Sequence, residues 1–384
     1  MSYATIRFGD LYAVGSRNGL TKPSKVRGSG YKMINMGELF ANDRIYDIPM
    51  ELVPLKETEK VSAKVEVGDL LFARQSLVLE GAGKCSIVLE VSPLTVFESH
   101  LIRVRLVDEA NPMFYYYYFR SSLSPVQSIV SQCAQAGIRG SDLQELEVLF
   151  PPKETQDRIA NVLEQYDNLI ENNRKQIALL EEAAQRLYRE YFVDLRFPGY
   201  ENTKIVDGVP EGWGKELVGN LIAKVPRTKQ IKVVDYLSEG VLPIIDQSRE
   251  FVAGYTDDKD ALVNTELPII VFGDHTRILK YIQFPFAKGA DGTQLIISNT
   301  TRMPQSLFYF SLVAVDLSNY HYARHFKYLK AEEIFVPPLD IANKFDKFAS
   351  PILLRIQKLR DTSNKLSEAR DRLLPKLMSG EITV

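Results

Sequence analysis

Two short stretches of the sequence are nearly the same: Val148-Leu149-Phe150-Pro151-Pro152 and Ile334-Phe335-Val336-Pro337-Pro338. They lie 186 residues apart, and each is followed by a charged stretch with helical periodicity. Self-similarity at a fixed displacement indicates repeated structural units. The chain therefore contains an internal repeat, and each copy has the same order of a globular segment followed by a helical one.

The helical segment of the first copy contains no Gly or Pro between Pro152 and Pro198. One helix of about 40 residues, or ~60 Å at 1.5 Å per residue, fits this stretch. Its apolar positions alternate steps of four and three, which gives the 3.5-residue period of a coiled-coil seam. The seam positions are Ile159, Leu163, Tyr166, Ile170, Asn173, Ile177, Leu180, Ala184, Leu187 and Tyr191. Asn173 either fixes the helix register as a buried amide or lies near solvent.

Adding 186 to each seam position places the same pattern in the second copy. The resulting positions are Phe345, Ala349, Ile352, Ile356, Leu359, Ser363, Leu366, Arg370, Leu373 and Leu377. Most of these are apolar, so a second seam is expected. Ser350-Pro351 resembles an N-cap followed by a first-turn proline, which predicts that the second long helix starts there and ends near Leu374.

The segments that precede the two Pro-Pro pairs consist of short β-branched and aromatic runs separated by turn residues, which is typical of strands. Examples are residues 64–74, 87–91, 101–107, 267–272 and 294–298. Their openings match as Phe8-Gly9-Asp10-Leu11 and Val218-Gly219-Asn220-Leu221, and a Gly-Asp pair recurs at Gly68-Asp69 and Gly273-Asp274.

These patterns predict an α+β protein with two globular domains of mixed helix and strand that are separated by two long coiled-coil helices. The expected boundaries are 1–152 for domain 1, 153–196 for the central helix, 197–338 for domain 2 and 339–384 for the C-terminal helix. If the two helices pair, they must be antiparallel, because the first leaves domain 1 for domain 2 and the second returns. A pseudo-twofold arrangement with a fixed span between the domains follows.

Composition excludes some classes of protein. Hydrophobic residues make up 45% and charged residues 25% of the chain, and no apolar run approaches the roughly 20 residues of a membrane helix. Two cysteines, Cys85 and Cys133, and an N-terminus without a signal-peptide pattern predict a reducing cytoplasm and reduced packing thiols. The net charge of −2 means that any surplus of basic residues for nucleic acid must be local.

Several motifs identify a family resemblance. The helix end Ala184-Gln185-Arg186-Leu187-Tyr188-Arg189-Glu190-Tyr191-Phe192-Val193-Asp194, followed by Val209-Pro210-Glu211-Gly212-Trp213, is similar to the central conserved region of Type I restriction-modification specificity subunits. Residues 373–382 resemble the C-terminal conserved region of these subunits. Residues 272–276 and 286–294 resemble a pattern inside their target-recognition domains.

The resemblance implies a subunit of a host-defence complex that recognises a bipartite site in double-stranded DNA, with one half-site for each domain. It also implies two methyltransferase (modification) subunits and translocase-nuclease (restriction) subunits as partners. S-adenosylmethionine, ATP and Mg would then be cofactors of the partners, and this chain would have no cofactor and no catalytic residue.

Motifs for catalysis in this chain itself are weak. Gly81-Ala82-Gly83-Lys84-Cys85-Ser86 lacks the early Gly and the Ser or Thr after Lys that a phosphate-binding loop needs, so a turn between strands is the better interpretation. The methyltransferase motif Asn/Asp-Pro-Pro-aromatic is absent from the sequence. His321 and His325 have a zinc-compatible spacing, but no third ligand is evident, so no metal is expected.

Three sets of residues are candidates for contacts with DNA. Basic clusters suited to phosphates open the domains, with Lys22, Lys25, Arg27 and Lys32 in the first and Lys224, Arg227, Lys229 and Lys232 in the second. Residues near the ends of the domains suit phosphates or guanine and comprise Arg139, Arg324, His325 and Lys327. Residues after the Gly-Asp pairs suit base edges and comprise Arg74, Gln75, His275, Thr276 and Arg277. Solvated loop charges are the alternative for the residues near the ends of the domains.

Two rival functions remain open at this point. One is a complete enzyme in a single chain, and the other is a coiled-coil scaffold whose end domains bind proteins instead of DNA. Tyr115, Tyr116, Tyr117 and Tyr118 are expected to be divided between core and surface and not to stack on bases, because readers of duplex DNA rarely need stacking platforms.

Overall fold

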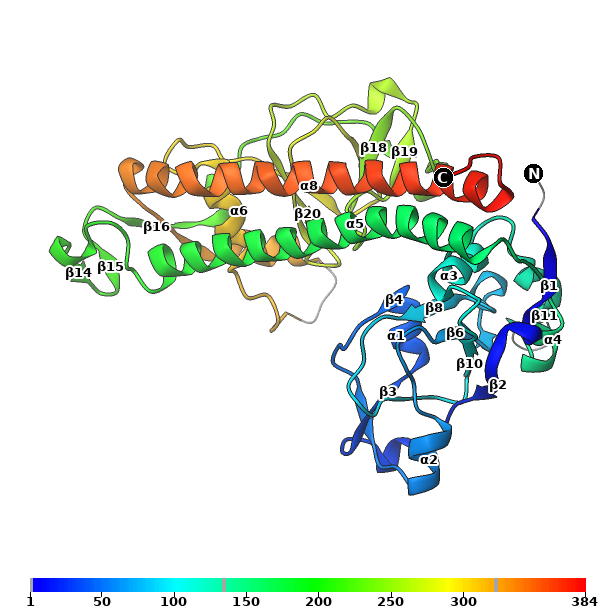
Figure 1. Cartoon of the computed structure of the whole chain (residues 1–384). Helices are drawn as coiled ribbons and strands as arrows, with labels where there is room; N and C mark the ends of the chain where they lie inside the picture. The colour runs from blue at the N-terminus through cyan, green and yellow to red at the C-terminus, as the bar shows by residue number, and fades with distance from the viewer. Residues whose placement is uncertain (1–2, 133–135, 321–323) are drawn as a thin grey trace. The chain divides into compact units, whose positions relative to one another are not determined.

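The computed structural model describes residues 3–132, 136–320 and 324–384. The chain divides into two compact units: unit 1 comprises residues 1–171 and 363–384, and unit 2 comprises residues 172–362. Two long helices, α5 (Lys153–Tyr188) and α8 (Leu339–Ser379), each contribute one stretch to either unit. They are the green and the orange-red helix of Figure 1. Each unit combines helices with strands, so the fold class is α+β, as predicted.

Unit 1 is built around a five-stranded sheet of order β2-β10-β6-β8-β4. The strands of unit 1 are β1 (Thr5–Arg7), β2 (Tyr12–Asn18), β3 (Tyr31–Ile34), β4 (Arg44–Ile45), β5 (Glu51–Val53), β6 (Leu70–Ala73), β7 (Gln75–Ser76), β8 (Cys85–Val88), β9 (Val96–Phe97), β10 (Leu101–Leu106), β11 (Ser131–Gln132), β12 (Ala136–Gly137) and β13 (Glu147–Leu149). Its short helices are α1 (Met36–Ala41), α2 (Glu57–Ser62), α3 (Pro112–Arg120) and α4 (Gly140–Gln144). Strand β6 pairs antiparallel with both β10 and β8, and all of its side chains are buried.

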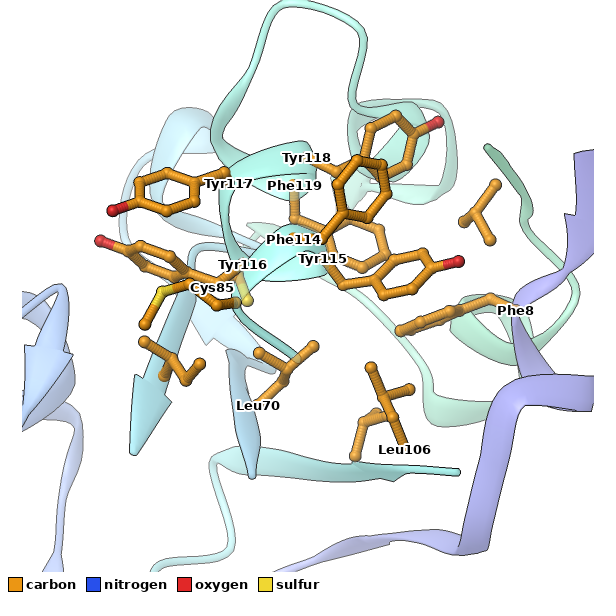
Figure 2. Close-up of a cluster of buried hydrophobic side chains, with 14 of the residues drawn as sticks. Phe8, Leu70, Cys85, Leu106, Phe114, Tyr115, Tyr116, Tyr117, Tyr118 and Phe119 are labelled. Atoms are coloured by element: carbon orange, nitrogen blue, oxygen red, sulfur yellow. The ribbon is translucent and has the colours of Figure 1, made fainter. Parts of the chain in front are cut away.

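Helix α3 forms the centre of the unit 1 core, as Figure 2 shows. Asn111 caps the helix by accepting hydrogen bonds from the second and third backbone amides that follow it, and Pro112 occupies the first turn. All four tyrosines of the run at 115–118 are buried, so the prediction that they divide between core and surface is wrong. The hydroxyls reach polar partners at the rim of the core: Tyr115 donates to the Leu149 carbonyl at 3.0 Å and Tyr117 to Asp167 at 2.7 Å. The rings of Tyr115 and Tyr117 can therefore be buried while their hydroxyls keep hydrogen-bond partners.

In unit 1, residues of α5 pack against residues of α8. Ile159 and Leu163 belong to the same buried cluster as Leu374 and Leu377. The buried carboxylate of Asp167 accepts a hydrogen bond from Tyr117 and forms an ion pair with Arg370 on α8.

Unit 2 contains a three-stranded sheet of order β21-β20-β23 and a four-stranded sheet of order β17-β22-β18-β19. Its strands are β14 (Ile205–Val206), β15 (Val209–Pro210), β16 (Gly214–Leu217), β17 (Gln230–Ile231), β18 (Leu242–Ile245), β19 (Gly254–Thr256), β20 (Ile269–Gly273), β21 (Leu279–Ile282), β22 (Ala287–Gly289), β23 (Thr293–Ile296) and β24 (Glu333–Val336). Helices α6 (Gln305–Val313) and α7 (His325–Ala331) complete it, together with a π-helical turn at Arg189–Val193. Strand β20 is buried throughout and pairs antiparallel with β21 and β23.

In unit 2, α8 begins at Leu339 and continues through Pro351, so the prediction of a helix that starts at Ser350 is wrong. Proline in a helix interior removes one backbone hydrogen bond and normally destabilises the helix. Here Phe345 and Ala349 are fully buried before the proline, and Leu353 is buried after it. Burial on both sides favours one continuous helix over the local preference for a break.

The two Gly-Asp pairs occupy different places in their units, so matching them to each other was wrong. Gly68-Asp69 precedes β6, and Asp69 forms an ion pair with Arg105 at 2.7 Å. Gly273-Asp274 ends β20, and Asp274 accepts a hydrogen bond from the Phe326 amide at 2.8 Å in the first turn of α7. The same dipeptide serves two different turns, because Gly-Asp suits many turn types.

Candidate nucleic-acid interface

The basic cluster that opens unit 1 is largely engaged in ion pairs. The Lys22 ammonium lies 2.7 Å from a carboxylate oxygen of Glu59 and lowers the pKa of that carboxyl group. The Arg27 guanidinium lies 2.5 Å from Glu51. Lys25 is exposed in a 3-10 turn at Ser24–Val26. The Lys32 ammonium lies 2.7 Å from Asp47. Of the four candidates, three therefore have their charge balanced by a neighbouring acid.

A second group of predicted residues lies at one end of the central sheet of unit 1. Arg74 and Gln75 directly follow β6, and Arg74 donates its amide to the His100 carbonyl at 2.8 Å. The Arg74 carbonyl accepts from the Ile138 amide at 2.9 Å, which places Arg139 one residue beyond this contact. Arg139 is exposed and Arg74 is half-buried, and neither forms an ion pair within residues 3–132, 136–320 and 324–384.

Arg17 belongs to the same region and was missed by the sequence reasoning. It lies on the edge strand β2 opposite Arg103 of β10, and it is exposed. The first turn of α4 approaches this strand, because a methyl group at Gly140 would lie 3.4 Å from the Ser16 hydroxyl. The basic residue nearest to Arg17 in sequence is Lys22, five positions later, so only the place of Arg17 on a sheet edge could have revealed it. We call Arg17, Arg74, Gln75 and Arg139 the unit 1 rim.

In unit 2, the loop after β20 is held by Gln247, a residue that sequence reasoning also missed. The Gln247 side-chain oxygen accepts from the His275 amide at 3.1 Å, and its carbonyl accepts from the Thr276 hydroxyl at 2.6 Å. Its side-chain nitrogen donates to the Asp291 carbonyl at 2.8 Å. These hydrogen bonds join the segments that contain Gln247, His275-Thr276 and Asp291. The side chains of His275 and Thr276 remain exposed.

Two predicted contacts of unit 2 are engaged with backbone carbonyls. The Arg277 guanidinium donates to Leu317 at 3.0 Å and to Tyr320 at 3.2 Å. His325 is buried, and its ring nitrogens lie 2.9 Å from the Asp274 carbonyl and 3.1 Å from the Tyr320 carbonyl. These two residues hold loops together, so we leave them out of the proposed interface.

The remaining basic candidates of unit 2 are exposed. They are Lys224, Arg227, Lys229, Lys232, Arg324 and Lys327. Lys229 forms an ion pair with Asp258, which raises the pKa of the lysine. For the other five, the described part of the chain contains no ion pair. Gln230 donates to the Gly289 carbonyl at 3.3 Å, so this basic segment lies beside the loop that follows β22.

None of the predicted seam residues of the long helices is exposed. The buried ones include Ile159, Leu163, Ile170, Asn173, Ala184, Phe345, Ala349, Ile356, Leu359 and Leu377. The half-buried ones include Tyr166, Ile177, Leu180, Leu187, Tyr191, Ile352, Ser363, Leu366, Arg370 and Leu373.

The described residues offer no group of three His, Cys, Asp or Glu side chains that could bind a metal ion. Cys85 is buried as a free thiol, and burial raises its pKa. Cys133 and His321 lie outside the described residues. Within the described part of the chain, no helix has the length and apolar character needed to cross a membrane.

Comparison with known proteins identifies the family that this chain resembles. Residues 2–182 match the family model of the Type I restriction modification DNA specificity domain. The predicted resemblance to the specificity subunits of Type I restriction-modification enzymes is thereby confirmed.

Individual relatives agree with this family. The specificity subunit of the Type I restriction enzyme MjaIX from Methanocaldococcus jannaschii is 26% identical over 64% of this chain, and the match spans 63% of that relative's length. The putative MjaX specificity subunit of the same organism is 23% identical over 96% of this chain and 91% of its own. The crystal structure of a Type I restriction-modification S subunit from M. genitalium has a TM-score of 0.60 at 16% identity, and the match covers 98% of this chain and 96% of that one. That structure shares the fold.

Proposed function

We propose that this chain is the DNA-reading subunit of a Type I restriction-modification complex and that it recognises a bipartite target. Each globular domain would read one half-site, and the paired long helices would set the spacer between them. Members of this family are generally not catalytic. Methylation and cleavage, with S-adenosylmethionine, ATP and Mg, would belong to two methyltransferase subunits and to the restriction subunits that dock on this chain.

The observation that carries the proposal is a framework that recurs in both units in matching register. In unit 1, the Phe8 amide donates to the Leu146 carbonyl at 2.8 Å, and in unit 2 the Val218 amide donates to the Glu332 carbonyl at 2.9 Å. Leu146 and Glu332 are 186 residues apart, which is the displacement of the sequence repeat. Strands β1 and β13 pair antiparallel, as do β16 and β24. A duplicated reader suits a target with two parts.

A second recurring detail is a close backbone approach at a glycine. A methyl group at Gly9 would lie 2.9 Å from the Gln144 carbonyl oxygen, and one at Gly219 would lie 3.1 Å from the Lys330 carbonyl oxygen. Gln144 and Lys330 are again 186 residues apart. The equivalence of the two Gly-containing turns supports a common ancestry of the two domains and a common way of presenting their loops.

The ion pairs between the long helices support an antiparallel rod. In unit 1, Asp167 of α5 pairs with Arg370 of α8. In unit 2, Glu181 of α5 pairs with Arg360 of α8 at 2.8 Å. Later positions on α5 thus meet earlier positions on α8. Two readers at a separation fixed by such a rod could address half-sites one helical turn of DNA apart, about 34 to 36 Å, or a multiple of it.

Exposed apolar side chains on the long helices support docking of protein subunits. Leu169 and Leu179 on α5 are 50% and 65% exposed, and Phe348 and Leu354 on α8 are 59% and 46% exposed. Exposed apolar side chains of this size are candidates for contact with a protein subunit.

The proposal can be tested in two steps. The full chain and its cognate methyltransferase subunits are first used to select a target from duplexes of random sequence. The selected duplex is then footprinted with the same proteins. The proposal expects two protected patches that are separated by an unprotected spacer of fixed length. Binding without any sequence preference would contradict it and would favour the scaffold alternative, in which the end domains bind proteins. Methyl transfer by the chain alone would contradict its non-catalytic role.

A further inference from the structure

The loop that follows β6 presents an unusual run of exposed apolar side chains. Leu77 is 89% exposed, Val78 is 58% exposed and Leu79 is 41% exposed. Single exposed aliphatic residues are common on protein surfaces, whereas three in succession at a loop tip expose a contiguous apolar group to water. Such a tip is expected to have a binding partner.

The loop is closed and held in one shape by hydrogen bonds. At its base, Ala73 donates its amide to the Lys84 carbonyl at 2.9 Å and accepts from the Gly83 amide at 2.8 Å. Near its tip, the Ser76 hydroxyl accepts from the Val78 amide at 3.2 Å. A methyl group at Gly81 would lie 2.2 Å from that hydroxyl and 2.9 Å from the Ser76 Cβ, so a larger residue there would force the turn to shift. The apolar tip is therefore presented by an ordered turn.

The base of the same loop is anchored to the rest of unit 1 by a shared carboxylate. The Lys84 ammonium lies 3.0 Å from Asp43, and the Arg120 guanidinium lies 2.8 Å from the same carboxylate. These contacts join the end of α3, the start of β4 and the loop base. The tip consequently projects from a fixed support.

The surroundings of the tip identify the kind of partner. Arg74 and Gln75 lie on the same loop, and Arg139 adjoins it through the contact between the Arg74 carbonyl and the Ile138 amide. Two cations without an ion pair in the described residues favour a polyanion over an apolar protein surface. Glu80 is the acidic residue of this loop, and a carboxylate among base edges can accept a hydrogen bond from cytosine.

The partner must therefore combine negative charge with small apolar groups, and the major groove of duplex DNA does so. Its apolar feature is the C5-methyl group of thymine, while its phosphates and its guanine and adenine edges suit Arg and Gln side chains. We propose that Leu77 and Val78 read thymine methyl groups in the half-site of the first domain. This inference rests on the proposed function, because it names the chemistry by which one domain selects its half-site.

The matching loop of unit 2 has different chemistry. After β20, the exposed residues are His275, Thr276 and Arg277, and the aliphatic pair that follows them, Ile278-Leu279, is half-buried. The two half-sites should therefore differ. We expect only the first domain to require thymine methyl groups that are read by a loop tip.

The test compares thymine with deoxyuridine, which lacks only the methyl group. A target is first selected from random duplexes with the full chain and its methyltransferase partners, and each thymine is then replaced by deoxyuridine in turn. Burying one methyl group corresponds to about a fourfold change in affinity. We expect such a loss at one or more positions of one half-site, and we expect the double variant L77A/V78A to bind both duplexes equally. Val61→Ala is the matched control, because Val61 is 81% exposed on α2 of the same unit.

The outcomes separate this inference from the proposed function. Specific binding without a deoxyuridine effect, including a half-site without A·T pairs, overturns the inference and leaves the proposed function intact. A deoxyuridine effect that persists in L77A/V78A also overturns it. An apolar wedge in the minor groove would give binding that depends on the tip but not on the thymine methyl group, and this result too contradicts the inference. If the unmodified protein shows no sequence preference, the proposed function itself fails.

Discussion

Neutralising Arg17 and Arg139 is expected to reduce the salt dependence of DNA binding, whereas neutralising Lys22 and Arg27 is not. The first two cations are exposed and form no ion pair in the described part of the chain. The other two lie 2.7 and 2.5 Å from carboxylates of unit 1. Because binding to duplex DNA releases counterions in proportion to the phosphates neutralised, only available charges contribute to the salt slope.

The expected magnitude follows from the number of available charges. Each phosphate contact contributes about 0.9 to the slope of log affinity against log salt, so R17Q/R139Q should lower the slope by about 1.8. Over a rise from about 50 to 200 mM salt, the variant should lose about twelvefold less affinity than the unmodified chain. The variant K22Q/R27Q should keep the original slope, even if its stability falls.

Fluorescence anisotropy of a labelled duplex, titrated with the full chain and its partners over a series of salt concentrations, measures these slopes. An equal reduction of the salt slope in R17Q/R139Q and in K22Q/R27Q would refute the distinction between paired and available cations. An unchanged slope in R17Q/R139Q would show that the unit 1 rim does not touch phosphates.

Three further predictions concern stability and can be checked by equilibrium unfolding in urea. Asp167→Ala should destabilise unit 1 by about 3 kcal/mol, because it leaves Tyr117 and Arg370 without their buried acceptor; a loss under about 1 kcal/mol would contradict this. Pro351→Ala should stabilise unit 2 by about 1 to 3 kcal/mol, since the helix regains a backbone hydrogen bond, and a destabilised variant would show that the proline is accommodated by a bend that packing requires. For Asp43, burial would raise the pKa, but the hydrogen bonds and charges of its two cationic partners outweigh burial and lower it from 3.8. Its stabilising contribution is thus present above pH 3.8 and lost as the pH falls below that value. Asp43→Asn should therefore flatten the pH dependence of unfolding below pH 3.8, and an unaltered profile would contradict this role.

The sequence allowed the order of elements to be predicted because the repeat is local and periodic. The stretches at 148–152 and 334–338 contain the ends of β13 and β24, which pair with the opening strands of their units. The 3.5-residue pattern places its positions away from solvent on both long helices. Periodicity of this kind records burial directly.

Features that depend on distant residues could not be predicted in this way. Pro351 was interpreted from its local preference, but burial of Phe345 and Leu353 on either side keeps the helix continuous. The tyrosines of α3 were expected to divide between core and surface, because a hydroxyl usually indicates partial exposure. Their partners, such as Asp167, lie about 50 residues away in sequence.

The candidate interface shows the same limit. Lys22 has the appearance of a phosphate contact in sequence, but its partner Glu59 is 37 residues away. His325 was a candidate for the same reason, yet it is buried against the carbonyl of Asp274. Arg17 stands apart from the basic clusters and becomes a candidate only once β2 is known to be a sheet edge. Which cations are available is a tertiary property.

The central claim is that the paired helices hold two DNA readers at a fixed separation. Its most direct test removes one heptad from each helix, residues 174–180 together with 360–366, and determines the preferred target by selection from random duplexes. Seven residues shorten a helix by about 10 Å, or about three base pairs of duplex. The account predicts a shorter spacer between two unchanged half-sites. Altered half-sites with an unchanged spacer would contradict it.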